Sequence, residues 1–206
     1  MASRTSIRSA LFAAAAPLSL GLLLGSSIAY YDEALPSSMN PLFARSMVDQ
    51  RAQELVFDRL YYRSAVTNQL LSRLVERDEE VADDALRLVM RQGVRWHDGK
   101  KVRPDDVCFT VRAMLNPSTP STVAQGYREV LAGCEVDKKE NTATIRFTRP
   151  FYNKKERLQF RVLPAHVFTS SAIRPDHPFA TQPIGSGPLR AERSTRALTL
   201  ERVDNV

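Results

Sequence analysis

Apolar residues recur at helical spacing in two parts of the chain. In residues 46–62 they fall on one face, which predicts an amphipathic helix whose apolar stripe joins the core: Val48, Ala52, Leu55, Val56 and Leu60. Ser46 is a suitable N-cap, with Asp49 three positions later. A second helix is expected over residues 103–115, because Pro104 suits the first helical position and the prolines after residue 115 cannot continue it.

Alternation of apolar and polar residues predicts strands elsewhere in the chain. Residues 86–90 alternate, and residues 127–136 and 142–148 flank a polar turn as a hairpin, with Ile145 and Phe147 facing inward. The remaining expected strands cover residues 30–35, 189–193 and 198–202. Because strands and helices are interspersed, a mixed class, α/β or α+β, is favoured over an all-α fold.

The first 29 residues combine a basic start, an uncharged apolar run and small residues at their end. This is the layout of a secretory signal peptide, with cleavage after Ala29 or alternatively after Ser27. A membrane anchor is the competing interpretation, but Pro17 and the glycines make the run short and weakly apolar for a stable span. We therefore expect an exported, periplasmic protein with a soluble mature part.

The basic excess of the chain is modest once it is located. The 206 residues hold 29 Lys and Arg against 23 Asp and Glu, a formal charge of +6, and Arg4 and Arg8 lie in the signal peptide. The remaining basic residues alternate with acids, as in residues 76–80, so a solvated mixed surface is favoured over nucleic-acid binding. A hydrophobic content of 43% is that of an ordinary folded domain and excludes a mostly disordered chain.

Two cysteines, Cys108 and Cys134, would lie in an oxidising compartment after export. A disulfide between them is one interpretation, and it would stabilise the fold by about 3 to 4 kcal/mol in the chain-entropy model. Two buried free thiols are the alternative, and the sequence does not decide between them.

No motif in the chain identifies an enzyme or a cofactor. The three histidines are scattered without metal-ligand spacing, Ser186 lies in a glycine pair too tight for a nucleophile elbow, and no phosphate-binding glycine loop is present. Asp105 and Asp106 point about 100 degrees apart on a helix, so they are better explained as complements of the helix dipole than as an acid and base pair. We expect no catalytic residue, no metal and no cofactor.

Several motifs, taken in order, resemble the N-terminal part of the family 5 extracellular solute-binding proteins, the receptor subunits of ABC importers for peptides and related solutes. The most specific stretch is 88–100 followed by 103–107, which contains Arg95-Trp96-His97-Asp98-Gly99. The segments 38–42, 57–60, 163–166 and 183–189 resemble further family motifs. The departures leave the resemblance intact: Asn40 for the usual Asp, Ser186 for Thr, and Leu189 for an aromatic residue.

The resemblance implies the N-terminal part of a type II periplasmic-binding-protein clamp, in which two lobes close on a ligand. The implied organisation is a signal peptide in residues 1–29, the start of the first lobe in 30–62, an inserted subdomain of strands and helices in 63–182, and a strand hairpin returning to the first lobe in 183–206. Full-length relatives are more than twice as long, so a truncated chain is expected. Trp96 is expected to pack beside a tight turn.

The family turn that lines the cleft corresponds to Pro36, Ser37 and Ser38, which are the expected ligand contacts. The implied function is the substrate-binding component of an ABC transporter, binding a peptide or small solute and docking on permease subunits as a monomer. Two alternatives stay open, a small secreted enzyme with an unrecognised site and a truncated remnant that binds nothing.

Overall fold

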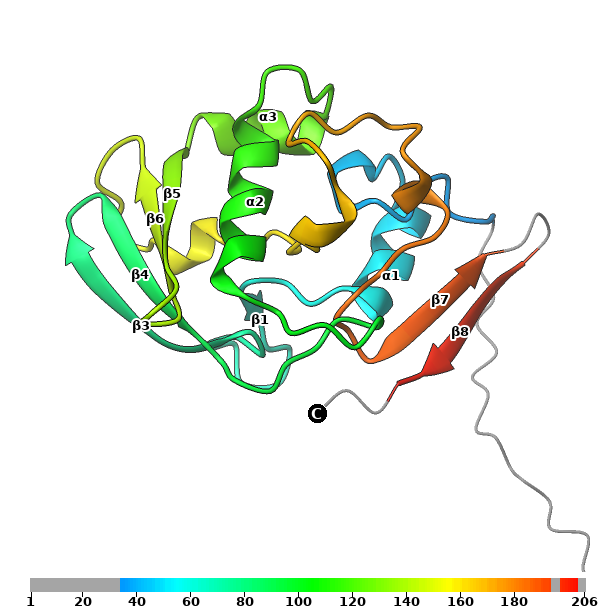
Figure 1. Ribbon diagram of the computed structural model, residues 1–206, viewed down its shortest axis with the longest axis horizontal. Helices are drawn as coiled ribbons and strands as arrows, with labels where there is room; N and C mark the ends of the chain where they lie inside the picture. The colour runs from blue at the N-terminus through cyan, green and yellow to red at the C-terminus, as the bar shows by residue number, and fades with distance from the viewer. Residues whose placement is uncertain (1–33, 194–196, 204–206) are drawn as a thin grey trace, which may run out of the picture.

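A computed structural model describes residues 34–193 and 197–203. A four-stranded antiparallel sheet of order β3-β4-β6-β5 forms one side, and helix α2 (Pro104–Leu115) packs across it, between the sheet and helix α1 (Met47–Val56) (Figure 1). The strands are β3 (Val75–Ala82), β4 (Ala85–Met90), β5 (Leu131–Asp137) and β6 (Thr142–Phe147). The chain is therefore a mixed α/β protein.

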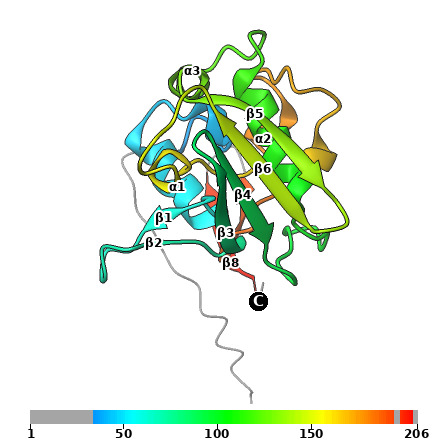
Figure 2. The ribbon, with the colours of Figure 1, turned by 90° about the vertical axis from the view of Figure 1, so that its left-hand side faces the viewer.

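The two central strands of the sheet carry its buried face. Leu86 of β4 pairs with Ile145 of β6, Leu88 pairs with Ala143, and all four side chains are buried. Figure 2 shows the sheet from its open side, with α2 behind β5 and β6. This one-sided burial explains the alternation that identifies both strands in the sequence.

Helix α3 (Thr122–Arg128) lies across the end of α2. Its Arg128 guanidinium donates to the carbonyls of Met114, Asn116 and Thr119 at 2.8 to 2.9 Å. A basic side chain thereby satisfies carbonyls that the end of α2 leaves without helical partners.

A disulfide joins α2 to the edge strand β5. It links Cys108 to Cys134, whose Cα atoms are 5.0 Å apart across a sequence separation of 26 residues. The bridge ties the helix covalently to the sheet on which it packs.

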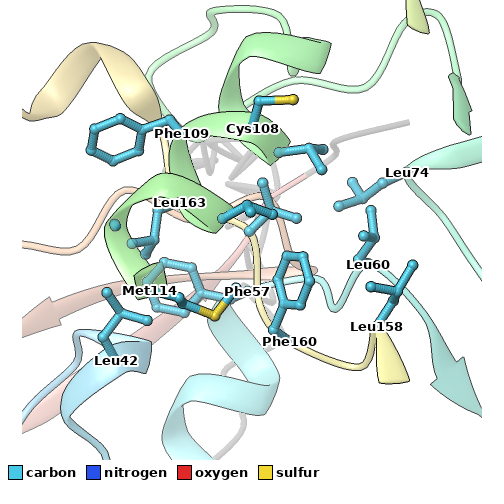
Figure 3. Close-up of a cluster of buried hydrophobic side chains, with 14 of the residues drawn as sticks. Leu42, Phe57, Leu60, Leu74, Cys108, Phe109, Met114, Leu158, Phe160 and Leu163 are labelled. Atoms are coloured by element: carbon cyan, nitrogen blue, oxygen red, sulfur yellow. The ribbon is translucent and has the colours of Figure 1, made fainter. Parts of the chain in front are cut away.

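One hydrophobic cluster runs from the sheet through α2 to α1 (Figure 3). Met114 of α2 lies between Leu42, Phe57 and Phe160, and Leu60 lies beside Leu74 and Leu158. All of these side chains are at most 5% exposed. Segments far apart in sequence thus share a single core.

Short elements complete the fold. The two-residue strands β1 (Tyr62–Arg63) and β2 (Leu70–Leu71) pair, and β7 (Leu189–Arg193) pairs with β8 (Leu198–Arg202) beside α1. The 3-10 turns are η1 (Pro41–Phe43), η2 (Lys155–Arg157), η3 (Ala165–Val167) and η4 (Pro178–Ala180). Within the described residues no helix is both long and apolar enough to span a membrane.

The helix expected over residues 46–62 is six residues too long at its C-terminal end. Helix α1 ends at Val56, and Phe57 is extended with φ −123° and ψ 132°. Beyond it the main chain pairs with a distant segment, because Leu60 N donates to Phe160 O at 2.8 Å and Tyr61 N to Leu158 O at 3.1 Å. Helical spacing continues in the sequence, but long-range pairing satisfies these backbone groups instead.

Besides the two-residue strands and the 3-10 turns, two longer elements were not expected. Strand β3 is mostly exposed and charged, so it lacks the alternation of a half-buried strand, and charge of this kind is typical of a sheet edge. Helix α3 contains Tyr127, which the sequence assigned to a strand; the strand begins only at Leu131. The glycine at position 126 obscures this short helix.

The other expected strands have different outcomes. The strands expected at 189–193 and 198–202 are confirmed with the expected bounds. Ile145 and Phe147 are buried, so they face inward as expected. Of the strand expected at 30–35, residues 30–33 lie outside the described part of the chain, and Ala34 and Leu35 are not in a strand. The expected signal peptide also lies outside the described residues.

Candidate functional site

A single carboxylate at the start of α1 holds the turn formed by residues 35–38. Asp49 Oδ1 accepts from the backbone N–H of Ser37 at 2.6 Å and of Ser38 at 3.4 Å. Its Oδ2 accepts from the Ser37 hydroxyl at 2.9 Å. The Asp49 side chain is fully buried, so the turn is fastened to the helix from within the protein.

The same carboxylate completes the N-terminus of α1. Asp49 Oδ2 accepts from the backbone N–H of Arg45 at 2.8 Å and of Ser46 at 3.2 Å, and the Ser46 hydroxyl accepts from Asp49 N in return. Burial acts to raise the pKa of Asp49, but the hydrogen bonds from Arg45, Ser37 and Ser38 outweigh it and hold that pKa below its ordinary value. Asp49 is therefore ionised at neutral pH and acts as an acceptor for the turn.

A second residue of α1 holds the far end of the turn. The Gln53 side-chain amide donates to the carbonyls of Ser38 at 2.9 Å and of Asn40 at 3.2 Å. Asn40 N in turn donates to the Ser38 hydroxyl at 3.1 Å. Gln53, Ser38 and Asn40 are all buried, so this end of the turn has no freedom to move independently of the helix.

The structure therefore brings together the three residues expected to contact ligand, with their polar side chains already in use. The Ser37 hydroxyl donates to Asp49, the Ser38 hydroxyl accepts from Asn40, and Pro36 is buried. Among the hydrogen bonds of the described residues, none uses the carbonyl oxygens of Leu35 or Pro36. These carbonyls have no partner among the described residues, and the Leu35 side chain is partly exposed.

The opposite end of α1 holds the segment 183–188. Gly187 N donates to Val56 O at 2.9 Å. A Cβ at Gly185 would lie 1.9 Å from that carbonyl oxygen, and one at Gly187 would lie 2.8 Å from Val56 C. Both positions require glycine because the two backbones are in contact.

His97 holds the same segment on its other side. Its backbone N donates to Gly185 O at 2.8 Å, its Nδ1 accepts from Gly185 N at 3.2 Å, and its Nε2 lies 2.9 Å from Gly187 O. Since Nδ1 accepts, Nε2 must carry the proton and donate to Gly187, which is one neutral tautomer of the ring. The geometry thus requires an uncharged imidazole.

The electrostatics around His97 favour that uncharged form. Burial lowers the pKa of His97, and the nearby Arg190 lowers it further, while the Gly187 carbonyl and Asp98 act in the other direction. Arg190 also donates to His97 O at 2.8 Å. The hydrogen bonds that join His97 to Gly185 and Gly187 are therefore all formed at neutral pH.

A cavity of about 410 Å³ opens beside His97 and the start of the segment 183–188. The turn at 35–38 approaches the same region, because Met39 N donates to Ala180 O at 2.9 Å, directly before the residues that line the cavity. The cavity is lined by residues from three segments of the chain. These residues are His97 and Asp98, then Thr181, Gln182, Pro183 and Ile184, and finally Arg190, Ala191 and Glu192. The two held segments and this cavity together form the candidate functional site.

An ion pair between a buried carboxylate and a partly exposed arginine lies next to the segment 183–188. Arg73 contacts Asp58 Oδ1 at 3.1 Å, and Asp58 N donates to the Ser186 hydroxyl at 3.4 Å. Burial raises the pKa of Asp58, and Arg73 and Ser186 offset this only in part. Ser186 is 1% exposed, so its hydrogen bond with Asp58 N lies in the interior of the protein.

The remaining residues singled out in the sequence lie at structural contacts. Asp106 is buried, and its carboxylate accepts from Trp96 Nε1 at 3.1 Å and from the backbone N–H of Arg103 and Ala165 at 2.8 Å. Trp96 is buried, as expected. Asp106 therefore does more than complement the α2 dipole, because it joins the helix to Trp96 and to η3. Burial raises the pKa of Asp106, and its hydrogen bonds offset this only in part.

The other two histidines make different contacts, and one of them reaches Asp98, which lines the cavity. His166 Nε2 lies 2.7 Å from Asp98 Oδ2, and His177 Nδ1 accepts from Phe179 N at 3.2 Å at the start of η4. Within the described residues no group of three or more His, Cys, Asp or Glu side chains could hold a metal ion.

Sequence reasoning did not find the residues that build this site. Asp49 was identified only as part of a helix start, and His97 only as part of a family motif. Neither the contact of Asp49 with Ser37 nor that of His97 with Gly187, 90 residues away, leaves a periodic signal. The glycines flanking Ser186 were the one available indication of a close backbone approach.

Comparison with solved structures identifies the fold. The fold is similar to the oligopeptide-binding protein AppA of Bacillus subtilis, solved with a nonapeptide, at a TM-score of 0.73 and 22% identity over 83% of this chain and 35% of AppA. It is also similar to the dipeptide-binding protein of Pseudoalteromonas sp. SM9913, solved with Met-Leu, at a TM-score of 0.70 and 17% identity over 84% of this chain and 39% of that one. This is the fold of solute-binding proteins.

The family follows from the sequence comparison. Residues 69–206 match the bacterial extracellular solute-binding proteins, family 5 (middle), and the chain belongs to this family. Among curated relatives, the peptidoglycan-binding protein YepA of Agrobacterium fabrum (strain C58 / ATCC 33970) is 27% identical over 190 residues, which are 85% of this chain and 29% of YepA. The chain thus spans about a third of the length of the relatives it matches.

Proposed function

We propose that this chain is the N-terminal portion of the substrate-binding component of an ABC importer, and that it binds peptides or related small solutes in the periplasm through the turn at residues 35–38. One observation carries the proposal. The turn is fixed to α1 by Asp49 and Gln53, while the carbonyls of Leu35 and Pro36 take part in no hydrogen bond among the described residues. A segment that is held in place, and whose carbonyls accept no hydrogen bond among the described residues, can accept hydrogen bonds from the backbone of an extended peptide.

The organisation in the family 5 clamp supports the same interpretation. In our proposal, residues 1–29 are a signal peptide, residues 30–62 and 183–206 belong to the first lobe, and residues 63–182 form the inserted subdomain. The four-stranded sheet with α2 and α3 falls inside the inserted range, while α1 and the β7–β8 hairpin fall outside it and contact each other. Helix α1 therefore holds both ends of the first lobe.

The relatives guide the choice of ligand. AppA was solved with a nonapeptide and the Pseudoalteromonas protein with a dipeptide, while YepA is named a peptidoglycan-binding protein. We propose that the ligand class includes peptides, among them those of peptidoglycan. Docking on permease subunits as a monomer belongs to the same proposal.

The test is a titration of the ¹⁵N-labelled chain with three probes, a dipeptide mixture, a nonapeptide mixture and a purified muropeptide mixture. We expect amide shift changes at Leu35, Ser37 and Ser38 and at residues 181–188, with those of the four-stranded sheet unchanged. Amide shifts report weak binding as well as tight binding, so the readout does not require a complete clamp.

A pair of variants provides the control. Leu35 and Val66 are both exposed apolar residues, 39% and 94% exposed, and only Leu35 lies in the proposed site. Leu35→Asp should reduce the shift changes several-fold, and Val66→Asp should not. If the probes leave the turn unperturbed, the binding proposal is wrong and the remnant alternative stands; if a probe is hydrolysed at a rate proportional to protein concentration, the enzyme alternative stands instead.

A further inference from the structure

A second cavity lies away from the candidate site, at the end of the sheet where the β5–β6 turn meets the stretch that follows β4. Its volume is about 530 Å³, within the range of pockets for small molecules. Asn141 in the β5–β6 turn bonds to Met90 at the end of β4, so the two walls are held together by the sheet. The third wall is the start of α2.

The charged residues that line this cavity are strongly biased to one sign. They are five cations and one carboxylate, namely Arg91, Arg95, Lys101, Arg103, Lys138 and Asp105. The cavity thus has four more cations than carboxylates. Residues 30–206 as a whole have the same excess of four, since they hold 27 basic and 23 acidic side chains. Four of these cations come from residues 91–103, and the fold adds Lys138 from the β5–β6 turn to the same opening.

Most of these cations have no carboxylate partner. Lys138 pairs with Asp105 at 3.4 Å, and among the described residues no carboxylate forms an ion pair with the other four. Arg91 and Arg95 donate instead to backbone carbonyls, Arg91 to Arg73 and Val75 and Arg95 to Gly99. Their positive charge is oriented but not neutralised.

Some cations elsewhere on the described surface form ion pairs with neighbouring acids, as Arg146 does with Glu135 and Lys155 with Asp78. Four cations without a carboxylate partner around one concave site produce a local positive potential. Such a potential attracts anions, and several guanidinium and ammonium groups together favour ligands with more than one negative charge.

We propose that this cavity binds a small polyanion, a ligand carrying at least two phosphate or carboxylate groups, at a site separate from the one that binds the transported solute. Lys101 and Arg103 contact the anion directly, while Arg91 and Arg95 are held in place by their backbone acceptors. Asp105 opposes binding by repelling the ligand and by occupying Lys138.

The test is calorimetric titration of the chain at low ionic strength with pyrophosphate and with citrate, and with acetate as a monovalent comparison. We expect pyrophosphate, citrate or both to bind at least tenfold more tightly than acetate, and the better of the two identifies phosphate or carboxylate chemistry. The double variant Lys101→Gln/Arg103→Gln should lower the affinity about tenfold or more, since it removes two charged donors that contact the anion. Asp105→Asn should raise the affinity several-fold, a gain that misfolding cannot produce.

The matched control is the double variant Arg45→Gln/Arg112→Gln, which removes the same charge from two exposed positions that do not line the cavity. Its affinity should stay within twofold of the parent. The proposal is overturned if neither polyanion binds, if both double variants lose affinity equally, or if Asp105→Asn leaves the affinity unchanged. None of these outcomes affects the peptide-binding proposal, whose readout lies at residues 35–38.

Discussion

The imidazole of His97 donates from Nε2 to the carbonyl oxygen of Gly187, 2.9 Å away and 90 residues later in the chain. Together with the bonds to Gly185, this contact holds His97 against the segment 183–188, whose Gly187 also bonds to Val56 at the end of α1. The contact exists only while Nδ1 is unprotonated, because Nδ1 accepts from Gly185 N.

The first prediction is a pH dependence of stability. The pKa of His97 is lowered by burial and by Arg190, so the unfolded chain takes up this proton at a higher pH than the folded chain. The free energy of unfolding should therefore fall as pH decreases below the ordinary value of 6.5, and His97 should add no slope above it.

Urea unfolding at pH 7.5 and pH 5.5 measures this effect. His97→Gln is the control, because its amide keeps a donor and an acceptor but has no titratable proton. The stability difference between the two pH values should be smaller in the variant than in the parent. Equal differences in both proteins would show that His97 does not couple folding to pH.

The second prediction concerns the glycine that lies against the end of α1. Gly185→Ala should destabilise the protein by about 3 kcal/mol, since its Cβ would lie 1.9 Å from Val56 O and the backbones must separate. Gly126→Ala is the matched control, because nothing lies within 4 Å of a Cβ there and the residue is helical. That change should stabilise the protein by about 0.5 to 1 kcal/mol, and thermal unfolding of both variants gives the comparison.

The third prediction concerns the disulfide between α2 and β5. Unfolding without reductant should release no thiol that reacts with a maleimide, and the double variant Cys108→Ser/Cys134→Ser should lose about 3 kcal/mol of stability. Denaturant unfolding of the oxidised parent and the variant measures the loss. Two reactive thiols per chain would contradict the bridge.

The fourth prediction concerns the carboxylate that holds the turn. Asp49→Asn should lower the free energy of unfolding by about 3 kcal/mol. Five groups donate to the Asp49 carboxylate, and in the variant only one uncharged oxygen remains to accept from them. Since the pKa of Asp49 is lowered, its stabilising effect is complete above the ordinary pKa of 3.8 and is lost as pH falls below it. The acid limb of the stability profile should therefore flatten in Asp49→Asn.

An exposed carboxylate serves as the reference for that change. Asp83 is exposed and forms no ion pair among the described residues, so Asp83→Asn should alter stability by less than about 0.5 kcal/mol. Peptide-induced shifts at Leu35 should be lost in Asp49→Asn and kept in Asp83→Asn. A turn that keeps its amide shifts in Asp49→Asn would show that the carboxylate does not position it.

Local sequence rules predicted those elements whose own side chains divide into buried and exposed faces. Helix α2 and strands β4 and β6 were predicted because their apolar residues face one core at a regular spacing. The C-terminal end of α1 was predicted wrongly, because a distant segment supplies the partners for Leu60 and Tyr61. Strand β3 was missed because it is itself an edge strand of the sheet, and most of its side chains remain in solvent.

The candidate site shows the same division. Pro36, Ser37 and Ser38 were chosen by resemblance to a family turn, and in the structure Asp49 and Gln53 of α1 hold Ser37 and Ser38 by hydrogen bonds. The side chains that hold them were not predicted, because a buried Asp or Gln in an amphipathic helix differs from a solvated one only through its tertiary neighbours.

The sequence by itself determined the mixed α/β class, the family motifs and a net charge of +6. It presented the basic residues as dispersed among acids. Only the tertiary structure decided that five of them surround one cavity, that His97 must be neutral, and that Gly185 has no room for a side chain. The physical reason is that charge pairing, tautomer and steric contact depend on distances in space, and residues far apart in the chain set those distances once the core has formed.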